Sequence, residues 1–218
     1  MSKINPDMFV KIKGKWFWRS DDTDFGDFNV LSRETELLEK VKPYLKNNKV
    51  AVQAGGNCGM QVVKFAEFFE YVYTFEPDPI NFNCLVNNLL YDNVFKMQCC
   101  LGDEHKLVSL NDDNLGIGGF YVNEKPGNIP TIKIDDLNLS ACDFIQLDVE
   151  GYTLQALKGG INTIKKFKPV LSLEFCWIER FGTSQKGLAD YLTNLGYVFK
   201  GMYTTDAIFV YESLSFKL

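Results

Sequence analysis

Two hydrophobic periods alternate along this chain. Short apolar runs typical of buried strands occur at residues 50–52, 71–75, 94–101, 142–147 and 169–175. Apolar residues recur at helical spacing over 32–45, 60–69, 81–90, 154–167 and 185–195, with Ser32 as a possible cap of the first helix. Two last β segments, 197–203 and 207–211, predict a hairpin. We therefore expect an α/β fold whose sheet is mostly parallel, with one antiparallel strand contributed by the C-terminal hairpin.

The first 30 residues have a different pattern. Polar and apolar residues alternate from Phe9 to Lys13, and Trp16-Phe17-Trp18 follows among charged and turn residues. This indicates a small β-like flap over residues 1–30, laid on a main domain that spans residues 31–218. The flap either packs on an edge of the domain or serves as a substrate lid.

A glycine-rich turn follows the first strand of the main domain. Gly55, Gly56 and Gly59 separate Val50–Val52 from the helix that begins at Met60. Glycine permits a positive φ and close approach of a ligand, and the N–H groups at a helix start attract polar groups. The spacing is G-G-x-x-G rather than the dinucleotide G-x-G-x-x-G, so the motif predicts either a ligand-binding turn or a structural one.

Acidic residues follow several of the predicted strands. Glu76 stands about 20 residues beyond the glycine turn, where an acid accepts from both ribose hydroxyls of a bound nucleoside in doubly wound sheets. Asp103 follows the third strand and is either an adenine contact or a solvated turn residue. Asp148 and Glu150 follow the fourth, and their side chains share one side if the extended conformation persists. Residues 104–130 are rich in turns and predict an insertion near the site.

Composition excludes several classes of function. The net charge is −5, with acidic and basic residues interspersed, so we expect no nucleic-acid partner. The six cysteines lack a C-x-x-C pair and predict reduced, buried thiols, and a single histidine, His105, excludes a histidine-rich metal site. No metal site is predicted, although a divalent ion held by Asp148 and Glu150 stays open. No signal peptide or membrane span is apparent, and we expect a soluble, cytoplasmic protein without a membrane partner.

Taken together, the motifs resemble the FkbM family of class I S-adenosylmethionine-dependent methyltransferases. The resemblance covers about residues 48–178 and is carried, in order, by the segments Ala54–Gly59, Phe75–Pro77, Leu101–Asp103, Ile134–Leu137, Leu147–Gly151 and Lys168–Glu174. It implies the Rossmann-like sheet of that class, with S-adenosylmethionine as the cofactor.

Site roles follow from the resemblance by position. It implies that the cofactor is bound by Gln53, Gly55, Gly56, Asn57, Gly59, Glu76, Leu101, Asp103 and Asp148. Asp148 and Glu150 would face the reacting centre as the catalytic residues, Asp148 being the first choice for the base, with Glu174 and His105 as weaker candidates. Two positions depart from the family pattern: Gln53 stands where an aspartate is usual, and Gln146 where a lysine is common.

The predicted activity is O-methyl transfer to a hydroxyl of a small-molecule or glycan acceptor. Gln53 and Gln146 motivate an alternative, a catalytically silent module that binds S-adenosylmethionine or another nucleoside and acts through a protein partner. A third hypothesis, nicotinamide-dependent oxidoreduction, fits Glu76 but not the glycine spacing.

Overall fold

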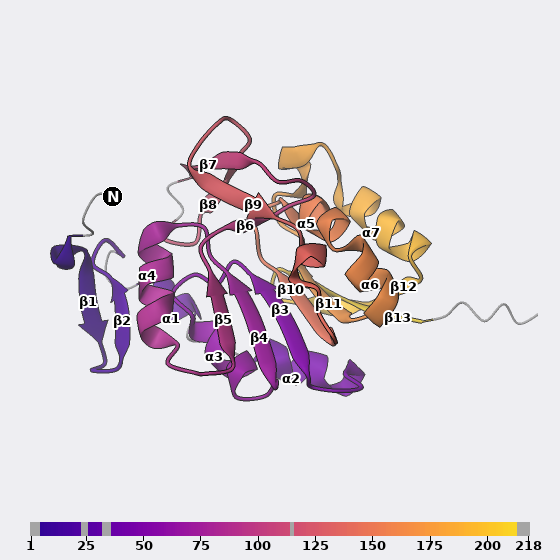
Figure 1. Ribbon diagram of the computed structural model, residues 1–218, viewed down its shortest axis with the longest axis horizontal. Helices are drawn as coiled ribbons and strands as arrows, with labels where there is room; N and C mark the ends of the chain where they lie inside the picture. Colours follow the sequence, from indigo (N-terminus) through magenta and orange to yellow (C-terminus); the bar gives the residue numbers. More distant parts are fainter. Residues whose placement is uncertain (1–4, 23–25, 32–35, 114–115, 213–218) are drawn as a thin grey trace, which may run out of the picture.

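The computed structural model describes residues 5–22, 26–31, 36–113 and 116–212 (Figure 1). A seven-stranded sheet forms its centre, in the order β12-β13-β11-β10-β3-β4-β5. Its strands are β3 (Val50–Ala54), β4 (Tyr71–Phe75), β5 (Val94–Met97), β10 (Phe144–Leu147), β11 (Val170–Glu174), β12 (Tyr197–Tyr203) and β13 (Asp206–Tyr211). Strands β5, β4, β3, β10 and β11 pair in parallel, while β13 pairs antiparallel with both β11 and β12. The predicted mostly parallel sheet with one antiparallel strand is confirmed.

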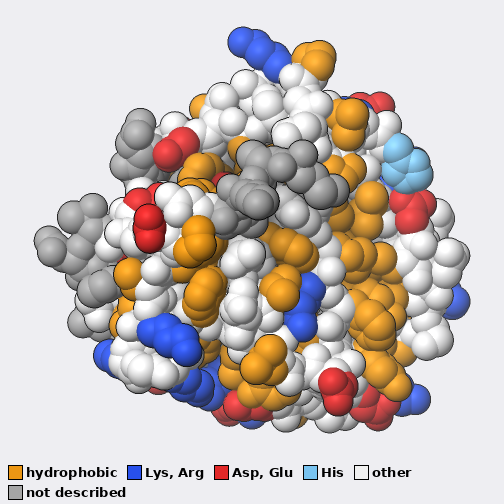
Figure 2. Space-filling model, turned by 60° about the vertical axis from the view of Figure 1, so that its left-hand side comes forward, with side chains coloured by type: hydrophobic (Ala, Val, Ile, Leu, Met, Phe, Trp, Pro, Cys, Tyr) orange, Lys and Arg blue, Asp and Glu red, His pale blue; other side chains and the backbone are white. Residues whose placement is uncertain are grey.

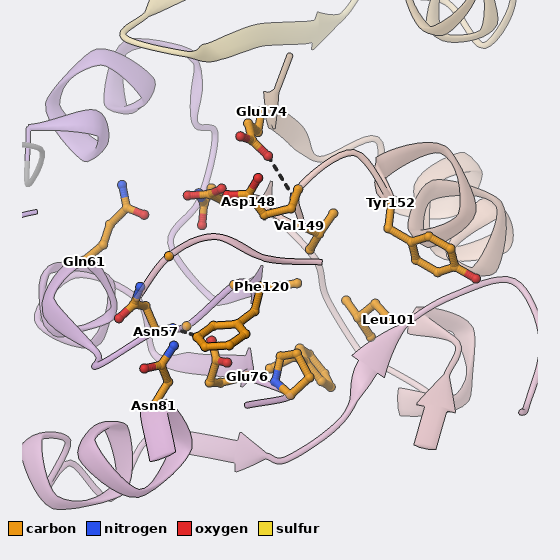
Figure 3. Close-up of a pocket in the computed structure, with 18 of the residues that line it drawn as sticks. Asn57, Gln61, Glu76, Asn81, Leu101, Phe120, Asp148, Val149, Tyr152 and Glu174 are labelled. Carbon is orange, nitrogen blue, oxygen red and sulfur yellow. Dashed lines mark hydrogen bonds between the residues drawn. The ribbon is translucent and has the colours of Figure 1, made fainter. Parts of the chain in front are cut away.

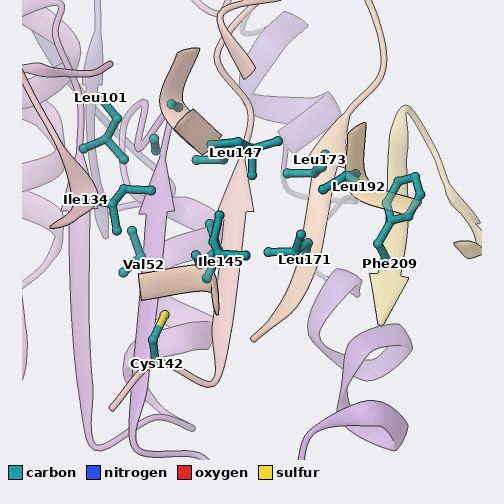
Figure 4. Packing of buried hydrophobic residues seen from close by; sticks show 14 of the residues in the cluster. Val52, Leu101, Ile134, Cys142, Ile145, Leu147, Leu171, Leu173, Leu192 and Phe209 are labelled. Atoms are coloured by element: carbon teal, nitrogen blue, oxygen red, sulfur yellow. The ribbon is translucent and has the colours of Figure 1, made fainter. Parts of the chain in front are cut away.

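Helices cover both faces of this sheet. One layer comes from α2 (Leu37–Val41), α3 (Met60–Ala66) and α4 (Pro79–Asn88), whose apolar residues share a core cluster with Ala51, Val72 and Phe144. The opposite layer comes from α5 (Thr153–Gly159), α6 (Ile161–Phe167) and α7 (Gln185–Asn194), packed on the other face. Figure 4 shows this second core, in which Val52, Ile145, Leu147, Leu171 and Leu173 project from neighbouring strands. Both faces of β3 and β10 are therefore buried, which explains their continuous apolar runs.

Several element boundaries differ from the sequence prediction for local reasons. Asp78 caps α4 by accepting from the backbone N–H of Ile80 and Asn81, so the helix begins at Pro79 rather than Asn81. The predicted helix 154–167 is divided at Gly160, whose position packs against Ile134. The helix predicted over 32–45 is present as α2 followed by a 3-10 turn, Lys42–Tyr44; its proposed cap, Ser32, lies outside the described residues.

The predicted insertion forms a second, four-stranded sheet. Strands β6 (Cys100–Leu101), β9 (Ile129–Ile132), β7 (Leu107–Asp112) and β8 (Phe120–Asn123) lie in that order, above the carboxyl ends of the central strands (Figure 1). The predicted strand 94–101 is therefore two strands, β5 and β6, which belong to different sheets. After β9 the chain forms a 3-10 turn, Ile134–Leu137, that leads back to the central sheet.

The N-terminal flap is a hairpin of β1 (Phe9–Ile12) and β2 (Trp16–Arg19) followed by a short helix, α1 (Gly26–Leu31). It lies beside α4 in Figure 1. Asn88 of α4 accepts from Phe17 N–H and donates to Phe17 O, while Arg19 bonds Asp78 and Asn81 at the start of the same helix. These contacts are those of a hairpin packed on the edge of the domain.

The surface carries both apolar and charged side chains. Aromatic side chains of β4 and β5 lie next to one another. The Phe95 ring stacks with Tyr73 at 4.7 Å between ring centroids, and its centroid lies 6.2 Å from that of Tyr71. Figure 2 shows hydrophobic side chains in a band below the histidine, with acidic and basic residues interspersed elsewhere on that face. All six cysteines are free, and five of them are buried. Within the described ranges, no helix is long and apolar enough to cross a bilayer.

Candidate active site

A cavity of about 260 Å³ opens where the central parallel strands end. Its walls come from the turns after β3, β4, β10 and β11, from the insertion sheet, and from the β12–β13 turn. Figure 3 shows Glu76 and Asn81 at one end and Asp148 and Glu174 at the other. The carboxyl edge of the sheet, beside the place where strand order reverses from β3 to β10, is where ligands bind in such folds.

The glycine turn forms part of the cavity wall. The N–H groups of Gly55 and Gly56 both donate to Phe75 O, which draws the turn over the end of β4. Gly55 has φ +84°, and a Cβ there would lie 1.8 Å from Asp148 O. Any side chain at position 55 would therefore collide with the β10 loop, so glycine is required by both conformation and space.

Glu76 lies under this turn and is 5% exposed. One carboxylate oxygen accepts from Asn57 N–H at 2.7 Å and the other from Asp78 N–H at 2.8 Å. Burial raises the pKa of Glu76 to about 8, despite these bonds and the nearby Arg19. Each oxygen keeps a lone pair that can accept from a ligand hydroxyl.

The insertion sheet supplies an apolar wall beside Glu76. Leu110, Ile117, Phe120 and Val122 line the cavity together with Leu101 of β6. Phe120 lies directly above Glu76 in Figure 3. Flat aromatic and branched aliphatic side chains around one carboxylate fit a ligand that is planar at one end and carries hydroxyl groups next to it.

Three carboxylates gather at the opposite end. One oxygen each from Asp148, Glu150 and Glu174 lies within 4.8 Å of the others. The sequence predicts that the side chains of Asp148 and Glu150 lie on one side only if the chain stays extended. The chain leaves the extended conformation after Asp148, since Glu150 has φ +52°, yet the two carboxylates still come together. Glu150 N–H donates to Glu174 at 2.9 Å, and this bond closes the loop.

Burial also raises the pKa values of two of these acids. The pKa of Glu150 rises to about 7 through burial, offset by Arg180, and that of Glu174 rises to about 8 through burial and the nearby Glu150 carboxylate. Arg180 lies 3.8 Å from Glu150, pairs with Asp113 of the insertion, and stacks over the rings of Tyr121 and Trp177. It therefore links the insertion sheet to the acidic end of the cavity.

Comparison with known proteins identifies the family. The family model for the methyltransferase FkbM domain matches residues 56–199, more than half of the chain. The chain belongs to the FkbM methyltransferase family. No curated protein sequence gives a significant match.

Solved structures share the fold of this FkbM family member. A methyltransferase FkbM from Methylobacillus flagellatus KT is 17% identical, with a TM-score of 0.53; the match covers 86% of this chain but 59% of that one, so this chain spans well under two thirds of it. Magnesium protoporphyrin IX methyltransferase from Synechocystis PCC 6803, solved with bound SAH, is 13% identical, with a TM-score of 0.50 and coverage of 88% and 86%. The common feature is the class I methyltransferase fold.

Most of the site residues expected from the sequence line the cavity of this FkbM family member. Its lining includes Gly55, Gly56, Asn57, Glu76, Leu101, Asp148 and Glu150. Gln53, Gly59 and Asp103 are not among the lining residues. Gln53 is buried and accepts from Thr74 Oγ1 at 2.5 Å. Gly59 precedes α3 as its N-cap, in the left-handed region, and Asp103 lies beside Gly159. His105 is exposed and contacts Asp136.

The sequence interpretation missed other lining residues. Two of them, Phe120 and Val122, belong to the turn-rich segment 104–130, and Tyr152 follows the acidic residues after β10. No short sequence motif marks any of the three. Glu174 was only a weak candidate for the base, yet it stands at the end of a buried strand like Asp148, and that repeated position was the available signal. No described residue of the flap lines the cavity.

Proposed function

We propose that this chain transfers the methyl group of S-adenosylmethionine to a hydroxyl of a small-molecule or glycan acceptor. One observation carries the proposal: a single cavity joins the glycine turn and Glu76 at one end to the carboxylates of Asp148, Glu150 and Glu174 at the other. A nucleoside cofactor and a proton-losing acceptor need these two environments side by side.

The residues at the Glu76 end fit the cofactor. Gly55 leaves its backbone open where a Cβ would strike Asp148 O, Glu76 offers lone pairs for ribose hydroxyls, and Leu101, Phe120 and Val122 form an apolar wall for adenine. Gly56 and Asn57 would line the methionine part. S-adenosylmethionine supplies an electrophilic methyl group on a sulfonium.

The carboxylates at the other end orient the acceptor and take its proton. Asp148 is the acid next to the glycine turn, and it is the proposed base; Glu150 is the alternative. A base whose pKa is near the working pH contributes roughly 10²–10⁴-fold to the rate. The pKa of Glu150, raised to about 7, satisfies that condition as well.

Two measurements test the function. Calorimetry with S-adenosylhomocysteine and, separately, with NAD distinguishes a methyltransferase from a nicotinamide enzyme, and tight NAD binding would reject the proposal. A methyl-release assay against sugars, nucleosides and phenols then identifies the acceptor class. S-adenosylhomocysteine binding without turnover on any acceptor would favour the silent module.

A further inference from the structure

Three carboxylates gather at the acidic end of the cavity, and Arg180 is paired with one of them, Glu150. Asp148 and Glu150 are partly buried, Glu174 is 5% exposed, and their nearest carboxylate oxygens lie within 4.8 Å of one another. Among the described residues that line the cavity, none is Lys or Arg. Arg180, at 3.8 Å from Glu150, stands beyond hydrogen-bond distance and is already paired with Asp113.

A separate residue points to a ligand at the same place. Gln146 is 1% exposed, lines the cavity, and its side-chain oxygen has no hydrogen-bond partner. Asp148 N–H donates to Ala54 O, which continues the ladder of β10 beyond its last residue, so Gln146 and Asp148 project on the same side of the sheet. A buried amide oxygen without a partner is costly unless something bound there satisfies it.

Glu150 gives a second unsatisfied oxygen. Its Oε2 is buried and has no hydrogen-bond partner, although Glu150 N–H is bonded to Glu174. Arg180 Nη1 forms an ion pair with this oxygen at 3.8 Å, too long for a hydrogen bond, so buried oxygens of Gln146 and Glu150 at one end of the cavity both lack a hydrogen bond. We propose that Asp148, Glu150 and Glu174 bind one divalent cation, with Gln146 Oε1 facing it directly or through a bound water.

The chemistry and spacing of the ligands select the kind of ion. Carboxylate and amide oxygens suit hard cations, whereas zinc favours histidine and cysteine, which are absent from the group. Ligands on opposite sides of Ca²⁺ are about 4.6–5.2 Å apart, and those on opposite sides of Mg²⁺ about 4.0–4.2 Å. Separations of up to 4.8 Å fall within the span of Ca²⁺, and any of them above about 4.2 Å would have to shorten for Mg²⁺ to bind.

The binding site stands independently of the proposed function, but its role rests on that function. An ion at this position would coordinate the acceptor hydroxyl and lower its pKa, so that less is demanded of a protein base. Acceptors with two adjacent oxygen atoms would then bind best, because both can reach one ion.

Calorimetric titration with Ca²⁺ and Mg²⁺ alone tests the site, with Glu174→Gln as the main variant. Glutamine keeps an oxygen for Glu150 N–H but removes the charge. Glu70→Gln is the matched control, because Glu70 is exposed and lies at the opposite end of β4. We expect one Ca²⁺ with a Kd below about 1 mM, weakened at least ten-fold by Glu174→Gln and unchanged in the control.

Three results would overturn the site. The first is no saturable Ca²⁺ binding up to about 10 mM, and the second is equal Ca²⁺ affinity in Glu174→Gln and Glu70→Gln. The third is binding of more than one ion with a stoichiometry that neither substitution lowers. If Glu174→Gln does not fold, Asp148→Asn replaces it, with the same expected loss. Tighter binding of Mg²⁺ than of Ca²⁺ would reject the assignment by size. S-adenosylhomocysteine binding, measured without metal on the same samples, separates failure of this site from failure of the proposed function.

Discussion

At the scale of single residues, Glu76 has the most specific environment in the cavity. Its two oxygens already accept from the backbone of Asn57 and Asp78, so the carboxylate is held in one orientation before any ligand arrives. That preorganisation lowers the cost of binding, since no side-chain freedom remains to be lost.

Replacing Glu76 with glutamine should weaken S-adenosylhomocysteine binding about 10- to 100-fold. The substitution removes at least one charge-assisted hydrogen bond, worth roughly 1.5–3 kcal/mol, while its amide keeps one oxygen acceptor. Calorimetry measures the change and circular dichroism checks the fold. Glu70→Gln, at an exposed position, is the control. An unchanged dissociation constant in a folded protein would remove Glu76 from the cofactor site.

Cofactor affinity should also depend on pH through Glu76. Burial raises its pKa from 4.5 to about 8, so most of the carboxyl is protonated at neutral pH without ligand. Ribose hydroxyls donate best to the ionised form. Affinity for S-adenosylhomocysteine should therefore rise about ten-fold between pH 7 and pH 9, and this rise should be absent in Glu76→Gln. Parallel pH profiles for the two proteins would contradict the assignment.

The same pKa predicts the direction of the stability change. Between about pH 4.5 and pH 8 the folded protein keeps a proton on Glu76 that the unfolded chain has released. The free energy of unfolding of the ligand-free protein should therefore decrease as pH rises through this range, and Glu76→Gln should flatten the decrease. Urea unfolding at several pH values measures it.

Asp148→Asn separates a base from a structural residue. If Asp148 takes the acceptor proton, kcat should fall roughly 100-fold or more while affinity for S-adenosylhomocysteine stays nearly intact, because the amide keeps the shape and loses the proton acceptor. Asp190→Asn, on the exposed side of α7, is the control. Undiminished turnover would transfer the role to Glu150.

At the scale of elements, the loop after β10 depends on a glycine. Gly151 has φ +96°, and a Cβ there would lie 2.3 Å from Trp177 O, so the loop can turn only if position 151 has no side chain. This turn places Glu150 beside Glu174. The segment Asp148–Gly151 thus encodes the position of a carboxylate as well as its identity.

Gly151→Ala should destabilise the protein by more than Gly182→Ala. Both glycines have positive φ, but nothing lies within 4 Å of a Cβ at Gly182. The control should cost roughly 1–2 kcal/mol, from conformation alone, and Gly151→Ala roughly 1–3 kcal/mol more through the added clash. Denaturant unfolding measures both. Equal losses of unfolding free energy in the two variants would show that the loop after β10 accommodates a Cβ at position 151 without a clash.

At the scale of the whole molecule, the insertion sheet closes one side of the cavity. Arg180 connects it to the central domain through Asp113 and through stacking with Tyr121 and Trp177, at 4.2 and 4.5 Å from the ring centres. The apolar wall of the cavity is therefore held in place by a residue from another part of the chain.

Arg180→Ala should loosen that attachment. Backbone amides of β7 and β8 should exchange hydrogen faster, while those of β10 should not change, because the central sheet does not depend on this contact. The pKa of Glu150 should rise further above 7, since Arg180 lowers it. Hydrogen-exchange mass spectrometry gives the first readout. Lys186→Ala, on an exposed helix surface, is the control, and equal exchange in both variants would contradict the prediction.

Local sequence determined the central sheet and most of the polar site. Buried strands such as β3 and β10 require continuous apolar runs, and acids follow the strands at the carboxyl edge, so the sequence alone singled out Glu76, Asp148 and Glu150, which line the cavity. Periodicity and strand ends are properties of short segments, and a single sequence displays them.

Tertiary structure alone decided how distant segments meet. The pairing of β6 with β9, the place of Phe120 and Val122 on the same cavity as Glu76, and the approach of Glu174 to Glu150 all join residues more than 20 positions apart. Asp103 shows the converse, since it follows a strand like the other acids but β6 belongs to the insertion sheet, and Asp103 does not line the cavity although Leu101 of β6 does. Such contacts depend on packing between elements, which leaves no period or motif in the segments themselves.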